Sequence, residues 1–362
     1  MARRLWRSFD WVLMGTATLL IIYGIAMISS ATRGTQELAD YWQRQAIFAV
    51  SGLALMLLVA AFDYRFYENL HRPLYILTIV LLIVVFVIGE ITHGAQRWIG
   101  PRGIQPSELA KVVVIIGLAK LLSDHDGEMD QFRYLLLSIG YVLLPIGLIY
   151  LQPDLGTALT LIFIWLTMAI IAGMRLLHLG ALTLAGVVAS PVVWLTLQDY
   201  MRERILLFVN PQGNPDDYYN VQQALISIGS GGWLGKGFGN GTQSQLHFLR
   251  VRHTDFIFSV IGEELGLLGA IVLFALFVIL LWRILRVATM AQDPFGRLIC
   301  IGVAAVIFLQ TTVNIGVNLG LLPVTGLPLP FVSYGGSSLW TFLIALGLVE
   351  SVAMRHKKLD FE

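Results

Sequence analysis

The sequence predicts an all-α polytopic membrane protein, with about ten transmembrane helices and a long extracytoplasmic loop between the seventh and the eighth. Hydrophobic residues make up 57% of the 362 residues, charged residues make up 13%, and the mean hydropathy is +0.75. Soluble proteins average about 45–50% apolar and about 25% charged residues. The departure in both directions indicates a chain that lies in a lipid bilayer. We expect residues 1–362 to form a single integral membrane domain, with residues 197–255 as its large loop.

A membrane-spanning helix needs about 20 mostly apolar residues. Stretches that approach this criterion are residues 9–30, 45–62, 73–90, 107–122, 134–151, 156–173, 177–196, 256–282, 298–320 and 334–354. The fourth is short and begins with charged residues, and the fifth contains Pro145, which predicts a kink.

The positions of Lys and Arg predict the orientation of these spans. If the N-terminus lies in the cytoplasm, most basic residues of the short loops and both tails fall on the cytoplasmic side. By the positive-inside rule, both termini are then cytoplasmic, the number of spans is even, and residues 197–255 lie outside. A connection this long is usually functional or disordered. We expect its apolar pieces, residues 205–209 and 221–228, to lie in the membrane interface or to re-enter the bundle.

Composition and motifs also exclude several functions. The net charge is +1 and no basic stripe is present, which argues against a nucleic-acid partner. Cys300 is the single cysteine, so no intrachain disulfide forms. The sequence has no Walker-type phosphate loop, so no nucleotide cofactor is expected. The apolar run after Arg3, Arg4 and Arg7 is longer than the core of a signal peptide, and we interpret it as a retained first span.

Asp255 is the first candidate for chemistry, because it lies where the long loop meets the eighth predicted span. Asp is favoured as a helix N-cap, where the helix dipole stabilises its charge, so a structural cap is one interpretation. Its neighbours favour a second interpretation, a carboxylate base beside the binding site of an anionic substrate. These neighbours are Arg250, Arg252, His253 and Thr254. The two interpretations are compatible with each other.

Two further pairs of charged residues lie inside predicted spans. Glu263 and Glu264 lie about two turns into the eighth span, roughly 12 Å along its axis. Charge at that depth is costly and predicts a functional site, with a structural ion pair to a Lys or Arg as the alternative. Glu108 and Lys111, three residues apart, share one face of the fourth span. They either pair with each other, or Lys111 lines a polar cavity and binds a phosphate or carboxylate.

Two charged residues of the predicted outer loops are also candidates. Arg97 lies beside Trp98, and this combination is typical of an anchor at the membrane interface. Asp154 precedes the sixth predicted span, where it could cap the helix. Each residue could instead contribute to the substrate cavity.

The segment from residue 323 to residue 338 contains too many Pro and Gly residues for a helix. Irregular backbone at membrane depth persists only where it is buried in protein or lines a wet cavity. We therefore expect this loop, which carries Ser333 and Ser337, to pack onto the Asp255 region. Asn314 and Asn318, one turn apart, face the same way shortly before it.

Taken together, these segments resemble the SEDS family (shape, elongation, division and sporulation). The segments that carry the likeness are Gly241-Thr242-Gln243, His253 to Phe258, Glu263 to Gly266, Gly94 to Trp98, Gln105 to Glu108, Gln152 to Thr157 and Leu329 to Ser338. The resemblance implies ten spans and two cytoplasmic termini. The Gly-Thr-Gln loop and the short tails resemble the members that act in cell elongation more than those that act in division. The sequence departs from the family at Arg250 and Val251, where relatives usually carry Pro and an acidic residue.

The resemblance implies a peptidoglycan glycosyltransferase that polymerises lipid II, a disaccharide-peptide on undecaprenyl diphosphate, during cell elongation. The essential Asp of the family maps onto Asp255. The implied partners are a class B penicillin-binding transpeptidase and the elongation-complex proteins MreC and MreD. The implied location is the bacterial cytoplasmic membrane, with the active site on its outer face.

The chemistry of that reaction fits these residue types. A positioned carboxylate that acts as general base contributes about 10²–10⁴-fold to the rate. A diphosphate leaving group needs its growing charge stabilised by Arg, Lys or a divalent cation. The available cations are Arg97, Lys111, Arg202, Arg204, Arg250 and Arg252. We expect Asp255 to act as the base or to hold a metal, Mg²⁺ or Mn²⁺, that activates the hydroxyl, with Lys111 and Arg97 serving the diphosphate. Two other functions stay open, a lipid II flippase and a non-catalytic scaffold of the wall-synthesis complex.

Overall fold

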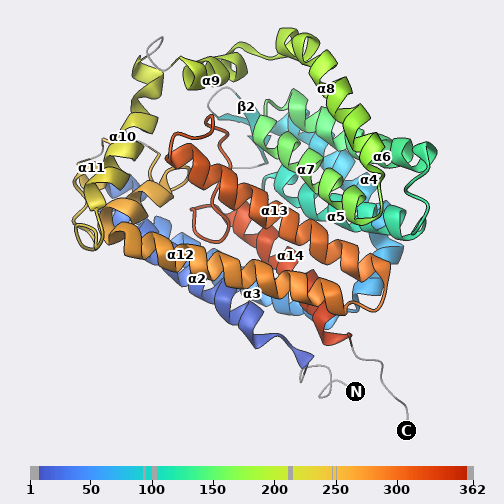
Figure 1. Ribbon diagram of the computed structural model, residues 1–362. Coiled ribbons are helices and arrows are strands. Elements are labelled where there is room, and N and C mark those ends of the chain that lie inside the picture. Colours follow the sequence, from blue (N-terminus) through green and yellow to red (C-terminus); the bar gives the residue numbers. More distant parts are fainter. Residues whose placement is uncertain are drawn as a thin grey trace.

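The computed structural model describes residues 8–92, 95–99, 104–210, 215–246, 248–249 and 251–356, which form a bundle of long helices (Figure 1). The helices are α2 (Trp11–Ala31), α3 (Tyr41–Ala61), α4 (Tyr64–Ile88), α5 (Pro106–Ser123), α6 (Phe132–Leu151), α7 (Leu155–Ile171), α8 (Leu176–Thr196), α9 (Asp199–Val209), α10 (Pro215–Gly231), α11 (Thr242–Gln245), α12 (Ile257–Met290), α13 (Pro294–Asn318) and α14 (Gly336–Met354). A short 3-10 helix, η2 (Gln36–Leu38), precedes α3. Strands β1 (Glu90–Thr92) and β2 (Ala95–Trp98) form an antiparallel hairpin between α4 and α5, which an all-α prediction did not include.

Each predicted span coincides with a helix, from α2 to α8 and from α12 to α14. Within the described residues, 8 helices are long and apolar enough to cross a membrane, and α7 is a shorter apolar helix of 17 residues. The polytopic, almost entirely helical fold is therefore confirmed, while the total of ten crossings stays a prediction. Pro145 lies inside α6, which runs without interruption from Phe132 to Leu151, and the predicted kink there stays a prediction.

Two helices form the centre of the bundle. In the most apolar window of α14, 83% of the residues are buried, and the value for α13 is 72%. The corresponding value for α8 is 0%, and this helix lies at the edge of the molecule (Figure 1). A central helix needs apolar residues all round, whereas a peripheral helix in a bilayer presents them to lipid. The most extensive helix contacts join α14 to α3 and α13 to α12, with α5 and α7 also packed on α13.

The segment of residues 197–255 is mostly helical instead of an open loop. It contains α9, α10 and α11, which follow α8 along one edge of the molecule (Figure 1). The apolar residues 205–209 end α9, and residues 221–228 lie in α10. Val221 and Ala224 of α10 are buried, and α10 packs against α12. The second apolar piece thus joins the bundle.

Helix α12 contains a break at Gly266, whose φ of 62° and ψ of −160° are not helical. Its 34 residues would span about 51 Å as a straight helix, more than the roughly 30 Å of a bilayer core. The break separates a short first segment, residues 257–265, from the long remainder. Backbone groups on both sides of it are bonded by residues 232–237, as Leu267 N to Gly232 O at 2.9 Å, Leu268 N to Trp233 O at 3.1 Å, Lys236 N to Glu263 O at 2.9 Å and Gly237 N to Glu264 O at 3.0 Å. These bonds give partners to backbone N–H and C=O groups that the break at Gly266 removes from the helix, and such groups cannot stay without a hydrogen bond inside a membrane.

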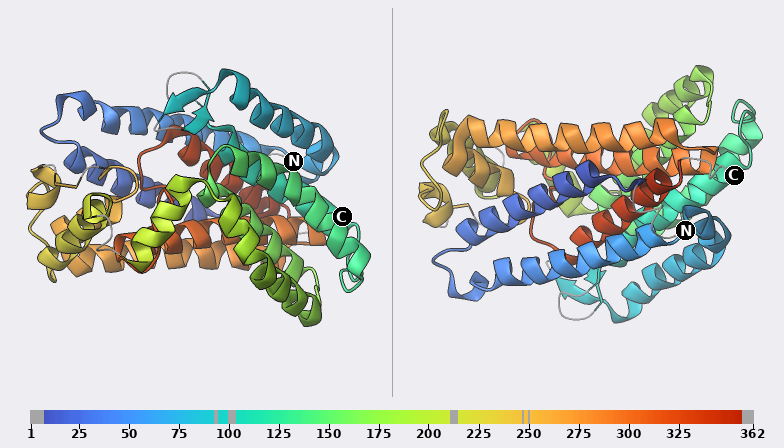
Figure 2. Two further views of the ribbon diagram at one scale, coloured as in Figure 1. Left: turned by 90° about the horizontal axis from the view of Figure 1, so that it is seen from above. Right: turned by 90° about the horizontal axis from the view of Figure 1, so that it is seen from below.

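The first and last of these helices meet at one end of the bundle. The Asp10 N–H donates to Glu350 Oε2 at 3.3 Å, and Ser351 Oγ donates to the Phe62 carbonyl at 2.7 Å. At the opposite end, the start of α5 meets the start of α14, where Gln105 N donates to Ser337 Oγ at 3.1 Å. The long helices run between these two ends (Figure 2). The predicted even number of crossings stays a prediction.

Candidate active site

Asp255 lies immediately before α12, and its backbone is fixed by α13. The Asp255 carbonyl accepts hydrogen bonds from Asn314 Nδ2 at 3.1 Å and Asn318 Nδ2 at 2.8 Å. Asn318 Oδ1 in turn accepts from the Ser259 N–H at 3.0 Å and from Ser259 Oγ at 2.6 Å. Because the helix N-cap is Phe256, the structure does not support Asp255 as the capping residue. The Asn318 side chain takes that role, and the Asp255 carboxyl is not engaged as a cap.

The loop after α13 closes over the same residues, as the sequence predicted. Ser333 Oγ donates to the Thr254 carbonyl at 2.6 Å and accepts from the Leu329 N–H at 2.9 Å. The Tyr334 N–H donates to the His253 carbonyl at 2.9 Å. Together with the two asparagines, these bonds hold three consecutive carbonyl groups, from residue 253 to residue 255. The backbone that carries the Asp255 carboxyl is therefore preorganised.

Burial, two arginines and a hydrogen bond from Thr254 act on the pKa of the Asp255 carboxyl. The side chain is half-buried, and burial raises the pKa of its carboxyl above the ordinary Asp value. Arg204, a hydrogen bond from Thr254 and Arg97 act in the opposite direction, in that order of size. Desolvation disfavours the carboxylate and nearby cations favour it, so the net rise shows that desolvation is the larger effect. An upward shift of the pKa is the direction expected of a carboxylate that acts as a general base.

Arg97 reaches this site from strand β2. Its guanidinium donates to the Gln152 carbonyl at 3.1 Å and also to the Pro153 carbonyl, and its Nη1 lies 4.0 Å from Asp154 Oδ1. Strand β2 fixes the backbone of Arg97, and the carbonyl groups just before α7 fix its guanidinium group. Arg97 is therefore a positioned cation near Asp255 instead of a free interface anchor.

Asp154 caps helix α7, as the sequence predicted. Its carboxylate accepts from the Thr157 N–H at 3.2 Å and from Thr157 Oγ1 at 2.9 Å. Gln105 Nε2 donates to the same carboxylate at 3.3 Å, and the Gln105 N–H donates to Ser337 Oγ. Asp154 and Ser337 thus belong to one polar network that joins the starts of α5, α7 and α14 beside Arg97.

Arg204 and Arg202 lie on α9 but have different surroundings. Arg204 Nη1 donates to the Val324 carbonyl at 3.3 Å, in the loop that closes over Asp255. Arg202 donates to the carbonyls of Trp194 and Leu195, at 3.0 and 2.7 Å, at the end of α8. Residues two apart on a helix do not share a face, which accounts for the difference. Arg202, predicted as a cavity residue, therefore binds the end of α8 instead.

Arg252 and His253 do not form the expected cluster of cations around Asp255. Arg252 is buried, and its guanidinium donates to the Ala31 carbonyl at the end of α2 and to Thr35 Oγ1 at 3.0 Å. His253 packs edge-on against Tyr41, with ring centroids 5.3 Å apart. Arg250, also considered as a cation of the site, lies outside the described residues. Within the part of the chain that the structure describes, Arg97 and Arg204 are the arginines that act on the Asp255 carboxyl.

Glu263 binds the segment before α12, and Glu264 binds both that segment and α2. Glu263 accepts from Lys236 Nζ at 3.0 Å and from the Gln243 and Ser244 N–H groups at 2.9 and 3.2 Å. It therefore caps the start of α11. Glu264 has its own partners, which are Ser30 Oγ at 2.6 Å and the Gly239 N–H at 3.0 Å. Of the two predicted interpretations, these contacts match the structural ion pair, in which Lys236 is the partner of Glu263.

Glu108 and Lys111 form a closed pair. Lys111 Nζ lies 2.7 Å from Glu108 Oε2, both side chains are buried, and the ammonium lies over the Phe342 ring at 5.2 Å. This geometry is the self-satisfied pair that the spacing allowed. A Lys111 that binds substrate phosphate would first have to leave Glu108.

The Lys111→Met variant is expected to lower stability sharply. Removing one partner of a buried ion pair leaves an uncompensated charge and costs about 3–5 kcal/mol. The double variant Lys111→Met with Glu108→Leu should recover most of that loss, because an apolar pair of similar volume is tolerated. Thermal unfolding of the three proteins in one detergent measures this. A double variant that regains stability but not activity would indicate a substrate role for Lys111.

Sequence reasoning missed one buried amide. Gln45 of α3 is 1% exposed, its Nε2 donates to the Ser333 carbonyl at 3.3 Å, and its Oε1 accepts from the Gly335 N–H at 3.2 Å. It therefore holds both sides of the turn that carries Ser333. Gln45 is the first residue of the predicted span 45–62 and follows Gln43 and Arg44, so the sequence did not distinguish it from the polar residues that flank a span.

The described residues limit the kind of metal site that this region could form. In these ranges, no three Asp, Glu, His or Cys side chains form a group that could hold a metal ion. Mg²⁺ is usually bound by one or two carboxylates together with substrate phosphates. Asp255 fits a cation whose remaining ligands come from the substrate phosphates. The described residues do not fit a metal that is held by protein ligands alone.

Comparison with known proteins identifies the family. The model of the FtsW/RodA/SpoVE family, described as cell cycle protein, matches residues 7–358. The chain belongs to this family. The resemblance to the SEDS proteins is thereby confirmed.

Relatives in the family carry names from both branches. Peptidoglycan glycosyltransferase MrdB of Escherichia coli K12 is 38% identical over 345 residues, which cover 94% of this chain and 92% of that protein. The probable peptidoglycan glycosyltransferase FtsW of Geobacter sulfurreducens is 38% identical over 367 residues, which cover 96% of each.

Solved structures share the fold. The rod shape determining protein RodA of Thermus thermophilus is 32% identical, with a TM-score of 0.73 and coverage of 97% of this chain and 98% of that one. A chain from a peptidoglycan synthase complex, solved in a study of coordinated polymerization and crosslinking, is 34% identical, with a TM-score of 0.83 and coverage of 96% and 98%. The expected likeness to RodA agrees with these matches.

Proposed function

We propose that this chain is a peptidoglycan glycosyltransferase that polymerises lipid II into glycan strands during cell elongation, with Asp255 as general base. One observation carries the proposal. The carboxyl group of Asp255 is half-buried and has a raised pKa, which Arg204 and Arg97 partly offset. Hydrogen bonds to the carbonyl groups of residues 253, 254 and 255 hold the backbone that carries it. The names of the family relatives, which are peptidoglycan glycosyltransferases, support the same activity.

In the proposed reaction, the 4-hydroxyl of the acceptor sugar attacks the anomeric carbon of the donor. Asp255 accepts the hydroxyl proton while the new C–O bond forms. The bond from the anomeric carbon to the lipid diphosphate breaks, and the diphosphate leaves with the electron pair. A positioned carboxylate base contributes about 10²–10⁴-fold to such a step.

Arg97 and Arg204 are the cations that we assign to the leaving diphosphate. Both are close enough to Asp255 to lower the pKa of its carboxyl, and backbone carbonyls hold both guanidinium groups. Fixed cations that meet developing charge are among the largest contributions to catalysis. Lys111 no longer takes this role, because it is paired with Glu108. In the alternative to a direct base, Asp255 would hold Mg²⁺ or Mn²⁺, and the cation would activate the acceptor hydroxyl.

The proposed setting is the bacterial cytoplasmic membrane, with both termini in the cytoplasm and Asp255 at the outer face. The proposed partner is a class B penicillin-binding transpeptidase, with MreC and MreD in the same elongation complex. The likeness to a chain of a peptidoglycan synthase complex supports the transpeptidase partner.

Lipid II polymerisation by the purified protein in detergent tests the proposed function. Detergent micelles have no second compartment, so glycan polymer formed there requires an enzyme instead of a flippase or a scaffold. Parallel reactions with EDTA, and with Mg²⁺ or Mn²⁺ restored, test the need for a cation. Folded protein that forms no polymer, with or without a transpeptidase partner, would contradict the proposal.

The Arg204→Gln variant should slow polymerisation about 10- to 100-fold, through weaker stabilisation of the leaving group. Arg204 is also the largest of the influences that lower the pKa of the Asp255 carboxyl. Its loss should raise that pKa further, so the acidic limb of the pH–rate profile should move to higher pH. Initial rates on lipid II across acidic and neutral pH measure both effects.

Arg202→Gln is the matched control for this variant. Arg202 lies on the same helix but binds the carbonyls of Trp194 and Leu195. Its loss should leave the pH–rate profile unchanged. Equal effects of the two substitutions would show that α9 acts through its fold and not through the Arg204 charge.

A further inference from the structure

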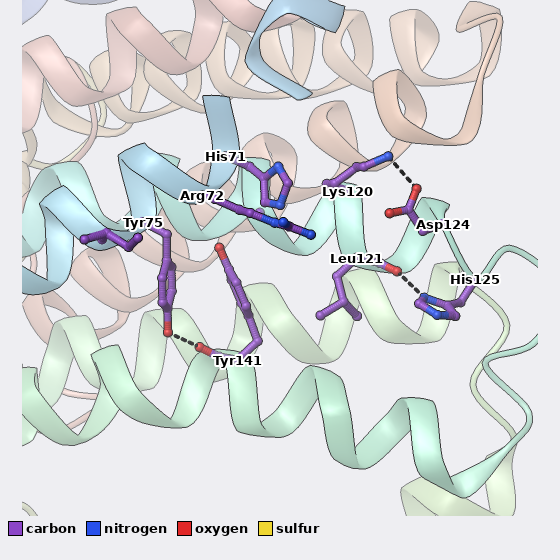
Figure 3. A pocket seen from close by; sticks show the side chains of 10 residues that line it. His71, Arg72, Tyr75, Lys120, Leu121, Asp124, His125 and Tyr141 are labelled. Carbon is purple, nitrogen blue, oxygen red and sulfur yellow. Dashed lines mark hydrogen bonds and ion pairs between the residues drawn. The ribbon is translucent and has the colours of Figure 1, made fainter. Parts of the chain in front are cut away.

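A cavity of about 360 Å³ lies between α4, α5 and α6 at the end of the bundle opposite Asp255 (Figure 3). Lys120, which lines it, follows the first residue of α5 by 14 positions, or about 21 Å along the helix. The start of α5 is the end that contacts Ser337 beside the candidate active site. The cavity is therefore separate from the Asp255 site. Its volume lies within the roughly 300–1,000 Å³ typical of small-molecule sites.

Arg72 supplies a positive charge to this cavity. It is an exposed residue of α4, and it has no hydrogen bond or ion pair with any other described residue. Lys120 differs, because its ammonium donates to Glu68 Oε1 at 2.7 Å and to Asp124 Oδ1 at 2.5 Å. The charge of Lys120 is thus balanced by protein carboxylates, and the charge of Arg72 is not.

Tyr141 supplies a hydroxyl group without a partner. Its oxygen is buried, and in the described part of the chain it makes no hydrogen bond. A Cβ at Gly117 would lie 1.7 Å from this oxygen, so the glycine on α5 provides the space that the hydroxyl occupies. In Figure 3 the hydroxyl end of Tyr141 points from α6 toward the face of α4 that carries Arg72. An unsatisfied buried hydroxyl is costly, and a ligand oxygen in this cavity would remove that cost.

Two histidines on the cavity wall each have one nitrogen engaged. His71 Nδ1 lies 2.6 Å from the Glu68 carbonyl, and His125 Nδ1 lies 2.9 Å from the Leu121 carbonyl. Because a carbonyl only accepts, each Nδ1 donates its proton and each Nε2 is left for another partner. Tyr75 completes the wall, since its hydroxyl donates to the Tyr141 carbonyl at 2.7 Å and joins α4 to α6.

Apolar surface adjoins these polar groups. Ile76, which lines the cavity, is 63% exposed, and its neighbour Leu77 is 54% exposed. In an integral membrane protein such residues face lipid chains. A ligand with an anionic head and an apolar tail would match the unpaired guanidinium, the free hydroxyl and this surface together. Basic pockets between membrane helices bind anionic lipid headgroups in this way.

We propose that this cavity binds the phosphate group of an anionic phospholipid from the leaflet on that side, with Arg72 and Tyr141 as its direct contacts. The acyl chains lie along the exposed face of α4 beside Ile76. The bound lipid bridges α4 and α6, which Tyr75 already joins, and its site is independent of the proposed glycosyl transfer.

Native mass spectrometry of the full-length protein, titrated with phosphatidylglycerol or with phosphatidylcholine, tests this site. The wild-type protein should retain phosphatidylglycerol in preference to the zwitterionic lipid. Arg72→Gln should weaken phosphatidylglycerol binding about tenfold, and Tyr141→Phe about threefold, since each removes one hydrogen bond to the phosphate. Arg286→Gln, an exposed arginine that stacks on Trp282 outside the cavity, is the control and should bind as the wild type does.

A second set of titrations separates a lipid from a soluble anion. Inorganic phosphate and glycerol 3-phosphate, which lack acyl chains, should displace the lipid only at far higher concentration. Displacement at equal concentration would overturn the lipid assignment in favour of a soluble phosphate. Undiminished binding to both cavity variants, or an equal loss in the Arg286 control, would overturn the site itself. Melting curves of all variants establish that each remains folded.

Discussion

The Asp255→Asn variant is expected to lose about 10²–10⁴-fold in glycan polymerisation while keeping its fold. The amide has almost the shape of the carboxylate, but it cannot accept the proton of the acceptor hydroxyl. The bonds that hold this residue use its backbone carbonyl, through Asn314 and Asn318, and the substitution leaves them in place. Initial rates on lipid II, together with a thermal melt of each protein, measure the two properties separately.

The same variant should be at least as stable as the wild type at neutral pH. Burial raises the pKa of the Asp255 carboxyl, so the folded state favours the protonated form more than the unfolded state does. The contribution of this group to stability is then complete below the ordinary Asp pKa and declines as pH rises through the raised value. Asn removes the charge that carries this cost. The stability difference between the two proteins should therefore narrow as the pH falls through the raised pKa, and should reach its minimum below the ordinary Asp pKa.

Two outcomes would contradict this account of Asp255. Full polymerisation by a folded Asp255→Asn protein would exclude the carboxylate as base. A melting temperature well below that of the wild type would show that the carboxylate stabilises the fold, and that the lost activity reports folding. Ser259→Ala is a useful comparison, since it removes a hydrogen bond to Asn318 in the same region without touching the carboxyl.

The arrangement of helices was predictable because the bilayer imposes a length on each apolar run. Each predicted span therefore coincides with a helix, although the limits shift by several residues, as in α3, which begins at Tyr41 instead of residue 45. The closure of the loop after α13 over residues 253–255 was predictable for a related reason. A segment rich in Pro and Gly cannot be helical, and its polar groups must find partners inside the protein.

The partners of individual charged residues were not predictable. Arg252 binds a carbonyl at the end of α2, 221 positions away along the chain. Glu263 binds the N–H groups that start α11, and Arg202 binds the carbonyls that end α8. Each of these acceptors or donors is an unpaired backbone group at a helix end. The sequence does not show which backbone groups at helix ends will need a side-chain partner. The charged residues near Asp255 therefore suggested one catalytic cluster, whereas in the structure several of them bind helix ends instead.

The break in α12 was equally hidden, because residues 256–282 read as one continuous apolar span. The structure instead inserts residues 232–237 against Gly266, with hydrogen bonds on both sides of the break. This contact fixes the short segment of residues 257–265, which begins next to Asp255. The conformation at Gly266 is therefore expected to support both the fold and the candidate site.

Gly266→Ala should destabilise the protein by about 3 kcal/mol or more. A φ of 62° with a ψ of −160° is adopted almost only by glycine, and other residues lose about 1–3 kcal/mol there. The added Cβ would also lie 2.4 Å from Gly235 N and 2.8 Å from Trp233 O, so the inserted segment must move and lose its hydrogen bonds. Gly229→Ala in α10 is the control, because a Cβ there meets nothing within 4 Å and a helical alanine gains about 0.5–1 kcal/mol. Thermal melts in one detergent compare the two variants. If Gly266→Ala had the melting temperature of the wild type, the contacts with residues 232–237 would not be what stabilises the break.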